Sequence, residues 1–263
     1  MKRNKAQADT VLVLGYFDGL HRGHQELFRT ARTMPMSKDS SSCFDLSRIS
    51  KIGLCPLPTR ILLHLQNPEE RFKRMEELGV DDLYLIDFTS DFAAHTAQEF
   101  VAAYLTALRA RVLVAGFDYS FGSDKKVACD LETYFKGQVI VVPPVLDQGE
   151  NQLNPYSAGH CIWPGQRSAD LLGYPLSSRG IVVHGDARGR TIGFPTANLA
   201  PIDRTHLPQD GVYVVEVEVL GQRHRGMASV GKTRPLMGRN FALKPISLIF
   251  QKIFMDIRFG FFG

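Results

Sequence analysis

Two histidines, His21 and His24, stand three residues apart between an apolar run and a helix-forming segment. The apolar run, residues 11–14, contains two β-branched residues and is typical of a strand buried on both faces. Residues 15–23 form a polar turn punctuated by glycines, and residues 25–32 contain helix formers. Free N–H groups and a partial positive charge at a helix start favour phosphate, and two imidazoles there can add hydrogen bonds or charge. The pattern predicts a phosphate-binding loop between a strand and a helix.

The elements that would position such a loop follow along the chain. The sequence predicts strands at residues 83–88, 112–115 and 139–142, and helices at residues 68–78 and 96–107. Strands alternating with helices of this length predict a parallel sheet covered by helices. In such sheets ligands bind beyond the carboxyl ends of the strands. The sequence GFDYSFG at residues 116–122 also follows a strand, so we expect it to face the same pocket as the histidine loop.

A different pattern begins at residue 178. Alternating or β-branched runs at residues 180–184 and 211–219, with turns at Gly185 and Gly221, predict an antiparallel all-β domain small enough to be a barrel. Between them lies GDARGRTIGFPTAN, residues 185–198. Its glycines allow the backbone to approach phosphates, and its arginines can neutralise them. Its threonine and asparagine offer oxygen ligands of the kind that Mg²⁺ takes beside nucleotide phosphates.

Composition limits the class of protein. A chain of 263 residues with 44% hydrophobic and 22% charged residues indicates one large or two ordinary globular domains. The formal charge of +4 can assist binding of anionic nucleotides, but it is too diffuse to indicate a nucleic-acid partner. The polar first nine residues predict no secretory signal, and no stretch is apolar enough to predict a membrane span. The four cysteines show neither metal-ligand spacing nor a disulfide framework. A cytoplasmic enzyme acting on small molecules is expected, and its oligomeric state stays open.

The motifs resemble those of one enzyme family. His21-Arg22-Gly23-His24 resembles the HxGH motif of nucleotidyltransferases, and the longer string GYFDGLHRGH is similar to the bacterial bifunctional riboflavin kinase/FAD synthetase family. GFDYSFG is similar to that family's GFDFxFG element, and GRTIGFPTANL resembles its riboflavin kinase motif. PQDGVY and GMASVG resemble later strands of the kinase domain.

The resemblance implies two domains and two reactions. Residues 1–175 would form a Rossmann-like FMN adenylyltransferase domain with a parallel sheet, and residues 176–263 a small antiparallel β-barrel riboflavin kinase domain, truncated. The chain would phosphorylate riboflavin to FMN and adenylylate FMN to FAD, using ATP and Mg²⁺ in each reaction. Riboflavin, FMN and ATP are therefore the expected partners, and neither nucleic acid nor membrane is expected.

The resemblance also assigns site residues. In the N-terminal domain these are the catalytic His21 and His24 and the nucleotide-binding Gly15, Phe17, Asp18, Gly23, Gly116, Asp118, Phe121 and Gly122. In the C-terminal domain they are the nucleotide-binding Gly185, Arg188, Gly189, Arg190, Gly193 and Pro195, and the Mg²⁺ ligands Thr196 and Asn198. Whether the two histidines act as general acids or only electrostatically stays open.

Three segments depart from the family's pattern, namely residues 34–60, 151–168 and 242–263, although matching residues adjoin them. A shifted reading frame explains this. Shifted by one base, codons for residues 151–156 can encode Ile-Ser-Ser-Thr-Arg-Ile, the family's ISSTxIR motif. Codons for residues 43–51 can likewise encode Val-Leu-Thr-Phe-Pro-Glu-Ser-Pro-Lys. In the other frame, codons for residues 242–250 can encode Ala-Glu-Ala-His-Ile-Phe-Asp-Phe, which resembles the strand carrying the kinase's catalytic base.

We therefore hypothesise that the sequence is a conceptual translation of a damaged or misread gene. The segments at residues 34–60 and 151–168 show no sustained periodicity, and the β domain is expected to lack its closing strand and terminal helix. The alternative function is then an impaired or inactive family member that at most binds nucleotide or flavin. A nucleic-acid-binding protein is a third hypothesis, which no basic cluster or stacking-aromatic motif supports.

Overall fold

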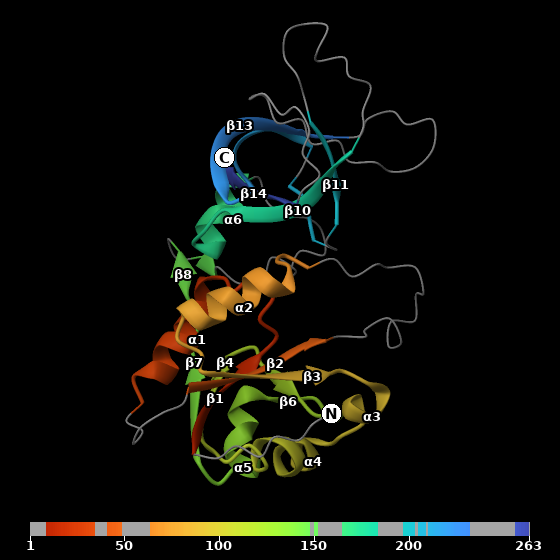
Figure 1. Ribbon diagram of the computed structural model, residues 1–263. Coiled ribbons are helices and arrows are strands. Elements are labelled where there is room, and N and C mark those ends of the chain that lie inside the picture. Colours follow the sequence, from red (N-terminus) through yellow and green to blue (C-terminus); the bar gives the residue numbers. More distant parts are fainter. Residues whose placement is uncertain are drawn as a thin grey trace, which may run out of the picture. The chain divides into compact units, whose positions relative to one another are not determined.

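The chain forms two compact units in the computed structural model (Figure 1). The structure describes residues 9–34, 41–48, 64–147, 150–151, 165–183, 197–202, 205–208, 210–231 and 256–262. Unit 1 contains Met1–Leu62 and Glu69–Leu153, and unit 2 contains Leu63–Pro68 and Asn154–Gly263.

Among the described residues, unit 1 is built on a five-stranded sheet whose neighbouring strands all run parallel. The strand order is β3-β2-β1-β4-β7. The strands are β1 (Thr10–Gly15), β2 (Ser41–Arg48), β3 (Asp82–Asp87), β4 (Ala110–Gly116) and β7 (Gln138–Val142). The predicted parallel sheet is therefore confirmed.

The helices and short strands of unit 1 complete this architecture. The helices are α1 (Arg22–Arg32), α2 (Pro68–Glu77), α3 (Ser90–Ala93), α4 (Ala97–Phe100), the π-helix η2 (Val101–Leu105), the 3-10 helix η3 (Ala128–Asp130) and α5 (Leu131–Tyr134). The short strands are β5 (Ser120–Phe121), β6 (Lys126–Val127), β8 (Leu146–Asp147) and β9 (Glu150–Asn151).

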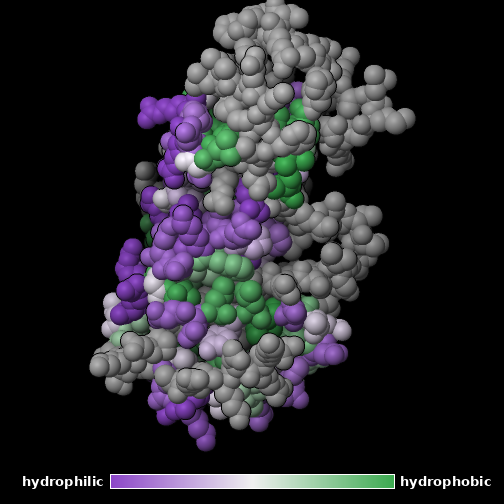
Figure 2. All heavy atoms as spheres, viewed as in Figure 1, coloured by the Kyte–Doolittle hydropathy of each residue, from purple (hydrophilic) through white to green (hydrophobic). Residues whose placement is uncertain are grey.

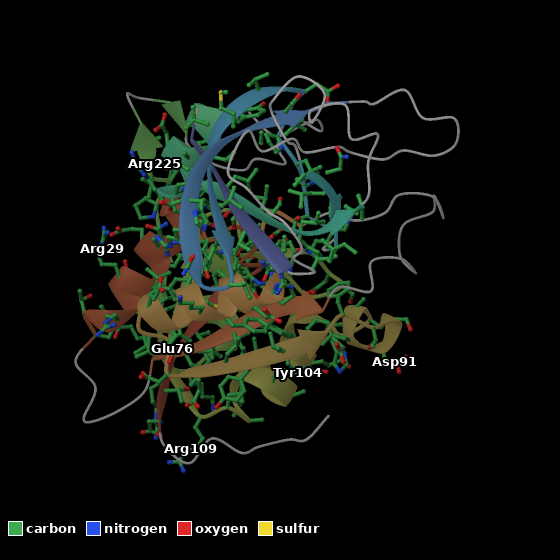
Figure 3. All side chains as sticks on the ribbon, turned by 45° about the horizontal axis from the view of Figure 1, so that its top comes forward. Arg29, Glu76, Asp91, Tyr104, Arg109 and Arg225 are labelled. Carbon is green, nitrogen blue, oxygen red and sulfur yellow. The ribbon has the colours of Figure 1, made fainter. Side chains whose placement is uncertain are left out.

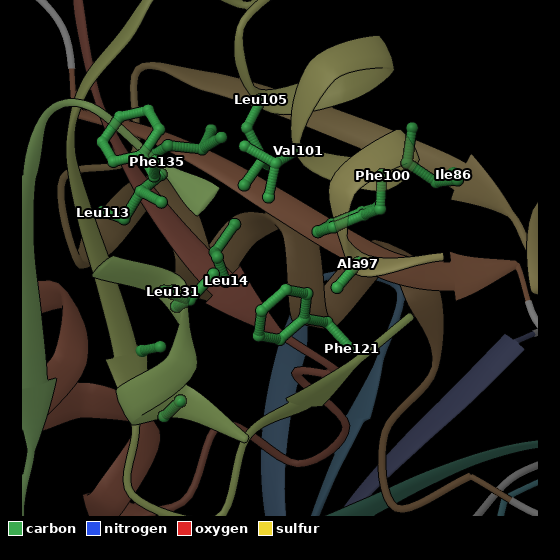
Figure 4. Close-up of a cluster of buried hydrophobic side chains, with 13 residues drawn as sticks. Leu14, Ile86, Ala97, Phe100, Val101, Leu105, Leu113, Phe121, Leu131 and Phe135 are labelled. Atoms are coloured by element: carbon green, nitrogen blue, oxygen red, sulfur yellow. The ribbon is translucent and has the colours of Figure 1, made fainter. Parts of the chain in front are cut away.

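Alternate side chains of β1 enter two different apolar clusters. Val11 and Val13 join the cluster that contains residues of α1 and α2. Leu12 and Leu14 join the cluster that contains residues of α4, η2 and α5, shown in Figure 4. Because successive side chains of a strand point to opposite faces, helices cover both faces of the sheet. Every residue of β1 is buried, as the continuous apolar run predicts.

Two details of unit 1 differ from the sequence-based expectations. β3 has only one buried residue, Ile86, although its sequence is typical of a buried strand. The reason is its place at the edge of the sheet, where covering by neighbours is incomplete. The predicted helix at residues 96–107 is observed as α4 followed by η2, with Phe100 and Leu105 facing the core as expected. The turn of π-helix follows from a bond of the Thr106 N–H to the carbonyl of Val101.

In the part of unit 2 that the structure describes, there is one helix and a five-stranded sheet with antiparallel pairing. Its elements are α6 (Gly165–Leu172), β10 (Leu176–Val183), β11 (Asn198–Pro201), β12 (Gly211–Val219), β13 (Gln222–Val230) and β14 (Asp256–Phe262). The strand order is β11-β10-β14-β12-β13. This confirms the antiparallel β domain. Within the described ranges β11 and β13 are not paired, so closure into a barrel stays a prediction.

The segments outside the family's sequence pattern nevertheless contribute strands. Ser41–Arg48 lies between β1 and β3, and Asp256–Phe262 lies between β10 and β12. The expectation that residues 34–60 contain no regular element is therefore wrong for β2, and the tail occupies an inner strand of its sheet. Strand pairing uses backbone groups that every sequence has, so two neighbouring strands can accept a third whose side-chain pattern is weak. Residues 49–63, 152–164 and 232–255 lie outside the described residues.

The surface of α1 and α2 is polar. Hydrophilic residues cover these helices in Figure 2, and Arg29 of α1 and Glu76 of α2 are exposed (Figure 3). No helix among the described residues is long and apolar enough to cross a membrane.

Candidate functional site

The strand order of unit 1 reverses between β1 and β4. These strands are parallel neighbours, with Leu14 opposite Ala115 near their carboxyl ends. The histidine loop follows β1 and the GFDYSFG loop follows β4, so both loops leave from adjacent positions at one edge of the sheet. Open parallel sheets bind ligands where the strand order reverses. The strands that precede the two loops are direct neighbours, and a shared pocket of the two loops stays a prediction.

The turn after β1 has a strained backbone. Gly19 has φ 79° and Leu20 has φ 37°, so two consecutive residues lie in the left-handed region. Leu20 is fully buried, and its carbonyl accepts a hydrogen bond from Nε2 of Gln25 at 2.9 Å. Burial and this hydrogen bond hold Leu20 in a conformation that costs about 1–2 kcal/mol for a residue other than glycine. The turn places His21 directly before α1.

His21 caps α1 and stacks on His24. Its Nδ1 accepts a hydrogen bond from the backbone N–H of His24 at 3.3 Å. The two ring centroids are 3.7 Å apart and the ring planes differ by 22°. Because Nδ1 of His21 is an acceptor, the neutral ring carries its proton on Nε2. The predicted histidine pair therefore forms one compact unit at the start of a helix.

Burial keeps both imidazoles neutral. It lowers the pKa of His21 from 6.5 to about 4, although the nearby Asp18 carboxylate opposes this shift. Burial also lowers the pKa of His24 well below 6.5, and the charges of His21 and Arg71 lower it further. Nδ1 of His24 is buried and has no hydrogen-bond partner among the described residues. At neutral pH the pair can donate hydrogen bonds to an anion without carrying charge itself.

The free energy of unfolding should fall as the pH is lowered from about 6.5 to 4. In this window unfolded His21 is protonated while folded His21, which is buried beside Asp18 and stacked on His24, is not. The unfolded state then binds more protons, and the full loss is about 3 kcal/mol for a pKa difference from 6.5 to about 4. His21→Asn keeps a side-chain acceptor for the helix cap and removes the titration. Urea unfolding at several pH values should therefore show a smaller acid loss in this variant. An equal loss in both proteins would contradict the assignment.

Phe17 supports His24 from within the core. Its side chain is fully buried, and its ring meets the His24 ring edge-on, with centroids 5.2 Å apart at 77°. It also contacts Phe28 of α1, with centroids 5.0 Å apart. A Cβ atom on Gly15 would lie 2.7 Å from the Phe17 ring, so glycine leaves the space that this ring occupies. Asp18 is 2% exposed beside His21. Of the sequence-predicted residues, Phe17 thus contacts His24, Asp18 lies near His21, and Gly15 makes room for the Phe17 ring.

The second loop is fixed to the start of α4. Oδ1 of Asp124 accepts a hydrogen bond from the backbone N–H of Ala97 at 2.9 Å, and Ser123 N–H donates to the carbonyl of His95 at 2.8 Å. Phe121 is 6% exposed and enters the core cluster under this loop. The other predicted residues of the loop are the half-buried Gly116 and Gly122 and the exposed Asp118.

Replacing Gly122 by alanine should destabilise unit 1 strongly. Gly122 has φ 75°, and an added Cβ would lie 2.5 Å from the backbone nitrogen of Ala97 and clash with Asp124. Left-handed backbone and overpacking together cost about 2–5 kcal/mol. Gly221 is a matched control with φ 75° and no atom within 4 Å of an added Cβ among the described residues. Gly221→Ala should cost only about 1–2 kcal/mol in urea unfolding. Equal losses would show that the Ala97 contact does not matter.

Arg71 is a candidate that the sequence reasoning missed. It lies on α2, is 3% exposed, and its charge reaches His24. A signal was present, because Arg71 stands four residues before the buried Met75 and therefore shares its helix face. In a helix rich in charged residues, one arginine on the apolar face is easily overlooked.

Most C-terminal candidates lie outside the described residues. These are Gly185, Arg188, Gly189, Arg190, Gly193, Pro195 and Thr196. The described Asn198 is half-buried at the start of β11, opposite Val183 at the end of β10. The stretch between Val183 and Asn198 therefore begins and ends at neighbouring positions. The described residues contain no cluster of three or more His, Cys, Asp or Glu side chains that could hold a metal.

Comparisons with known proteins agree with this division of the chain. The FAD synthetase family model matches residues 3–153 and the riboflavin kinase family model matches residues 172–252. A bifunctional riboflavin kinase/FMN adenylyltransferase from Listeria monocytogenes is 35% identical over 234 residues, covering 84% of this chain and 72% of the relative. The chain belongs to the bifunctional riboflavin kinase/FMN adenylyltransferase family. Enzymes of this family are transferases.

Two further relatives extend the comparison. The family member from Escherichia coli K12 is 33% identical over 242 residues, covering 87% of this chain and 74% of that protein. A solved structure from Streptococcus pneumoniae, described as a macrolide-efflux protein, is 46% identical with a TM-score of 0.87. It covers 97% of this chain and 86% of that chain.

Proposed function

We propose that this chain makes flavin cofactors in two steps, phosphorylating riboflavin to FMN and adenylylating FMN to FAD. The observation that carries the proposal is the neutral histidine pair at the start of α1, at the point where the parallel strand order reverses. A helix start at such a point binds phosphate groups. The matches to both enzyme families support two reactions on one chain.

The adenylyl transfer belongs to unit 1. An oxygen of the FMN phosphate attacks the α-phosphorus of ATP, the bond to the β-phosphate oxygen breaks, and pyrophosphate leaves. His21 and His24 donate hydrogen bonds to phosphate oxygens on which negative charge increases. Because stacking holds the two neutral rings in place, their N–H donors need not move as the reaction proceeds. Donors that are already in position stabilise the charge of the transition state efficiently. The buried charge-free state favours this role over that of a general acid.

The remaining N-terminal candidates have positional roles in this proposal. The Phe17 side chain is fully buried, so only the Phe17 backbone would contact the nucleotide. The Phe17 ring contributes by holding the His24 ring in place. Gly15 leaves room for the Phe17 ring, and Gly23 keeps a side chain away from the phosphates. From the second loop, Asp118 is exposed and able to reach ligand, while Phe121 fixes the loop from below. Gly122, with φ 75°, allows the loop to turn, and Gly116 is the half-buried last residue of β4.

The phosphorylation of riboflavin belongs to unit 2. The 5′-hydroxyl oxygen of riboflavin attacks the γ-phosphorus of ATP, the bond from this phosphorus to the bridging oxygen breaks, ADP leaves, and the hydroxyl proton is released to water. Arg188, Arg190 and the backbone near Gly185, Gly189, Gly193 and Pro195 would bind phosphates. Thr196 and Asn198 would hold Mg²⁺, which would neutralise phosphate charge when bound. The half-buried carboxamide of Asn198 fits this metal, because Mg²⁺ prefers oxygen ligands and usually takes the rest from water and nucleotide phosphates. We place both reactions in the cytoplasm, where ATP is available.

The proposal is tested by supplying purified protein with riboflavin, ATP and Mg²⁺ and separating the flavins by chromatography. FMN should form first and FAD afterwards. Neither product should form when EDTA replaces Mg²⁺. Supplying FMN in place of riboflavin should give FAD and pyrophosphate without ADP. Formation of FMN alone would overturn the assignment of unit 1, and FAD formation only from added FMN would overturn that of unit 2.

A further inference from the structure

Gln25 of α1 binds the carbonyl groups of two consecutive residues in the turn before the helix. Its backbone N–H donates to the carbonyl oxygen of His21 at 3.0 Å, as in a regular first helical turn. Its side-chain Nε2 donates to the carbonyl oxygen of Leu20 at 2.9 Å. Helical side chains lean toward the N-terminus, so a long side chain near the helix start can reach back over the residues before it.

The carbonyl that the Gln25 side chain binds belongs to a strained residue. Leu20 has φ 37° and follows Gly19, which has φ 79°. Its side chain is fully buried, so the turn cannot relax without exposing apolar surface. The net contribution of one hydrogen bond is of the same order as the cost of a left-handed backbone at a residue other than glycine. The bond from Gln25 can therefore offset the strain at Leu20.

This bond also bears on the histidine pair. The Leu20 carbonyl and the His21 N–H belong to one planar peptide unit, so a partner that fixes this carbonyl also fixes the direction in which the chain enters His21. Nδ1 of His21 accepts from the His24 N–H at 3.3 Å, which is long for a hydrogen bond, and the two rings stack with centroids 3.7 Å apart. Rotation of the peptide unit would break the first contact and separate the rings.

We propose that Gln25 is a positioning residue for adenylyl transfer, whose carboxamide holds the peptide unit between Leu20 and His21 and thereby places the His21 ring against His24. The reaction named here rests on the proposed function, whereas the positioning rests on the two hydrogen bonds of Gln25. Gln25 acts through the turn and the histidines, without contact with the reacting phosphates. A carbonyl oxygen only accepts hydrogen bonds, so the role requires an N–H donor at position 25.

Gln25→Met tests the proposal on the full chain, because methionine keeps the length and the helix propensity of the side chain without its donor. The kcat of FAD formation from FMN and ATP should fall by about tenfold to a hundredfold, as expected when catalytic groups shift by a fraction of an ångström to one ångström. The KM for ATP should stay within about twofold, because the histidines act mainly on charge that develops in the transition state.

Three further variants separate the donor from the shape of the side chain. Gln25→Glu keeps the shape but offers only acceptors at neutral pH, so it should lose at least as much kcat as Gln25→Met. Gln25→Lys restores an N–H donor and should lie between Gln25→Met and wild type. Gln98→Glu makes the same change at an exposed position of α4 and should stay within about twofold of wild type. Gln25→Glu carries the test if the methionine variant fails to fold.

The His21 imidazole gives a second readout of its own position. Burial lowers the pKa of His21 to about 4 in the wild-type chain. In Gln25→Met the ring should lose part of this burial, so its pKa should rise toward 6.5. A substitution that only lowers the free energy of unfolding would leave this pKa unchanged in the folded protein. NMR titration of the imidazole signals measures the pKa.

The outcomes distinguish this inference from the proposed function. A kcat of Gln25→Met within about twofold of wild type, or an unchanged pKa of His21 in that variant, would overturn the inference. If the pKa of His21 rises in Gln25→Met but wild type forms no FAD from FMN and ATP, Gln25 still positions the histidine pair and the adenylyltransferase function fails.

Discussion

Replacing His24 by asparagine should lower the rate of FAD formation by about 10²- to 10⁴-fold. The His24 ring is stacked on His21 at 3.7 Å and supported by the Phe17 edge, so no other side chain can take its place without rearrangement. The loss should appear in kcat more than in the KM for ATP, because the hydrogen bond strengthens as charge develops on the phosphate. Steady-state kinetics with FMN and ATP measure both constants.

Phosphorylation of riboflavin provides the internal control for this variant. His24 lies in unit 1, whereas the riboflavin kinase model matches residues within unit 2. FMN formation by His24→Asn should therefore stay within about twofold of wild type. A parallel loss of both activities would indicate a folding defect, and an unchanged FAD rate would contradict the role of the histidine pair.

Replacing residues 151–156, Asn-Gln-Leu-Asn-Pro-Tyr, by Ile-Ser-Ser-Thr-Arg-Ile should raise the rate of FAD formation by at least about 10²-fold. In the sequence this stretch follows β7, the neighbour of β4 in the sheet of unit 1, and it begins at the last residue of the short strand β9. The replacement supplies hydroxyls and an arginine for the nucleotide phosphates, and phosphate transfer depends mainly on positioning and charge stabilisation. Residues 152–156 lie outside the described residues, so the prediction rests on the codon argument.

A matched replacement measures how much of the gain in FAD formation depends on the arginine. Ile-Ser-Ser-Thr-Gln-Ile at the same positions should recover only a small part of the gain. Sequencing the gene gives an independent check, because its codons must encode Ile-Ser-Ser-Thr-Arg-Ile in the shifted frame. Codons that cannot do so, or equal FAD rates for all three chains, would refute the frame-shift hypothesis.

The elements around the histidines could be predicted because local and global signals agree there. The apolar run of β1 requires burial on both faces, the following turn requires glycine, and α1 contains helix formers from Gln25 onward. Gly79, with φ 83°, ends the α2 region as its sequence predicts. Gly173, with φ 77°, likewise follows the end of α6. The alternation of parallel strands with helices then determines which two loops follow neighbouring strands. These are the histidine loop and the GFDYSFG loop, because β1 and β4 are neighbours at the reversal of strand order.

The remaining features depend on contacts that no local pattern contains. β3 has the sequence of a buried strand, yet its place at the sheet edge leaves it mostly uncovered. β2 and β14 pair through their backbones between neighbours that are far away in sequence. The burial of Arg71 arises only when α2 packs onto the cluster that also contains residues of α1. Spacing predicts which residues gather, but tertiary packing decides their charge state and their partners.

Labelled ATP tests the central claim most directly, namely that the reversal of strand order in unit 1 is the adenylyl-transfer site of a two-reaction enzyme. With riboflavin as substrate, ATP labelled at the γ-phosphate should label FMN, and ATP labelled at the α-phosphate should label only FAD. His24→Asn should lose the α-label in FAD and keep the γ-label in FMN. Equal incorporation of the α-label by wild type and His24→Asn, or no α-label in FAD with wild type, would contradict the account.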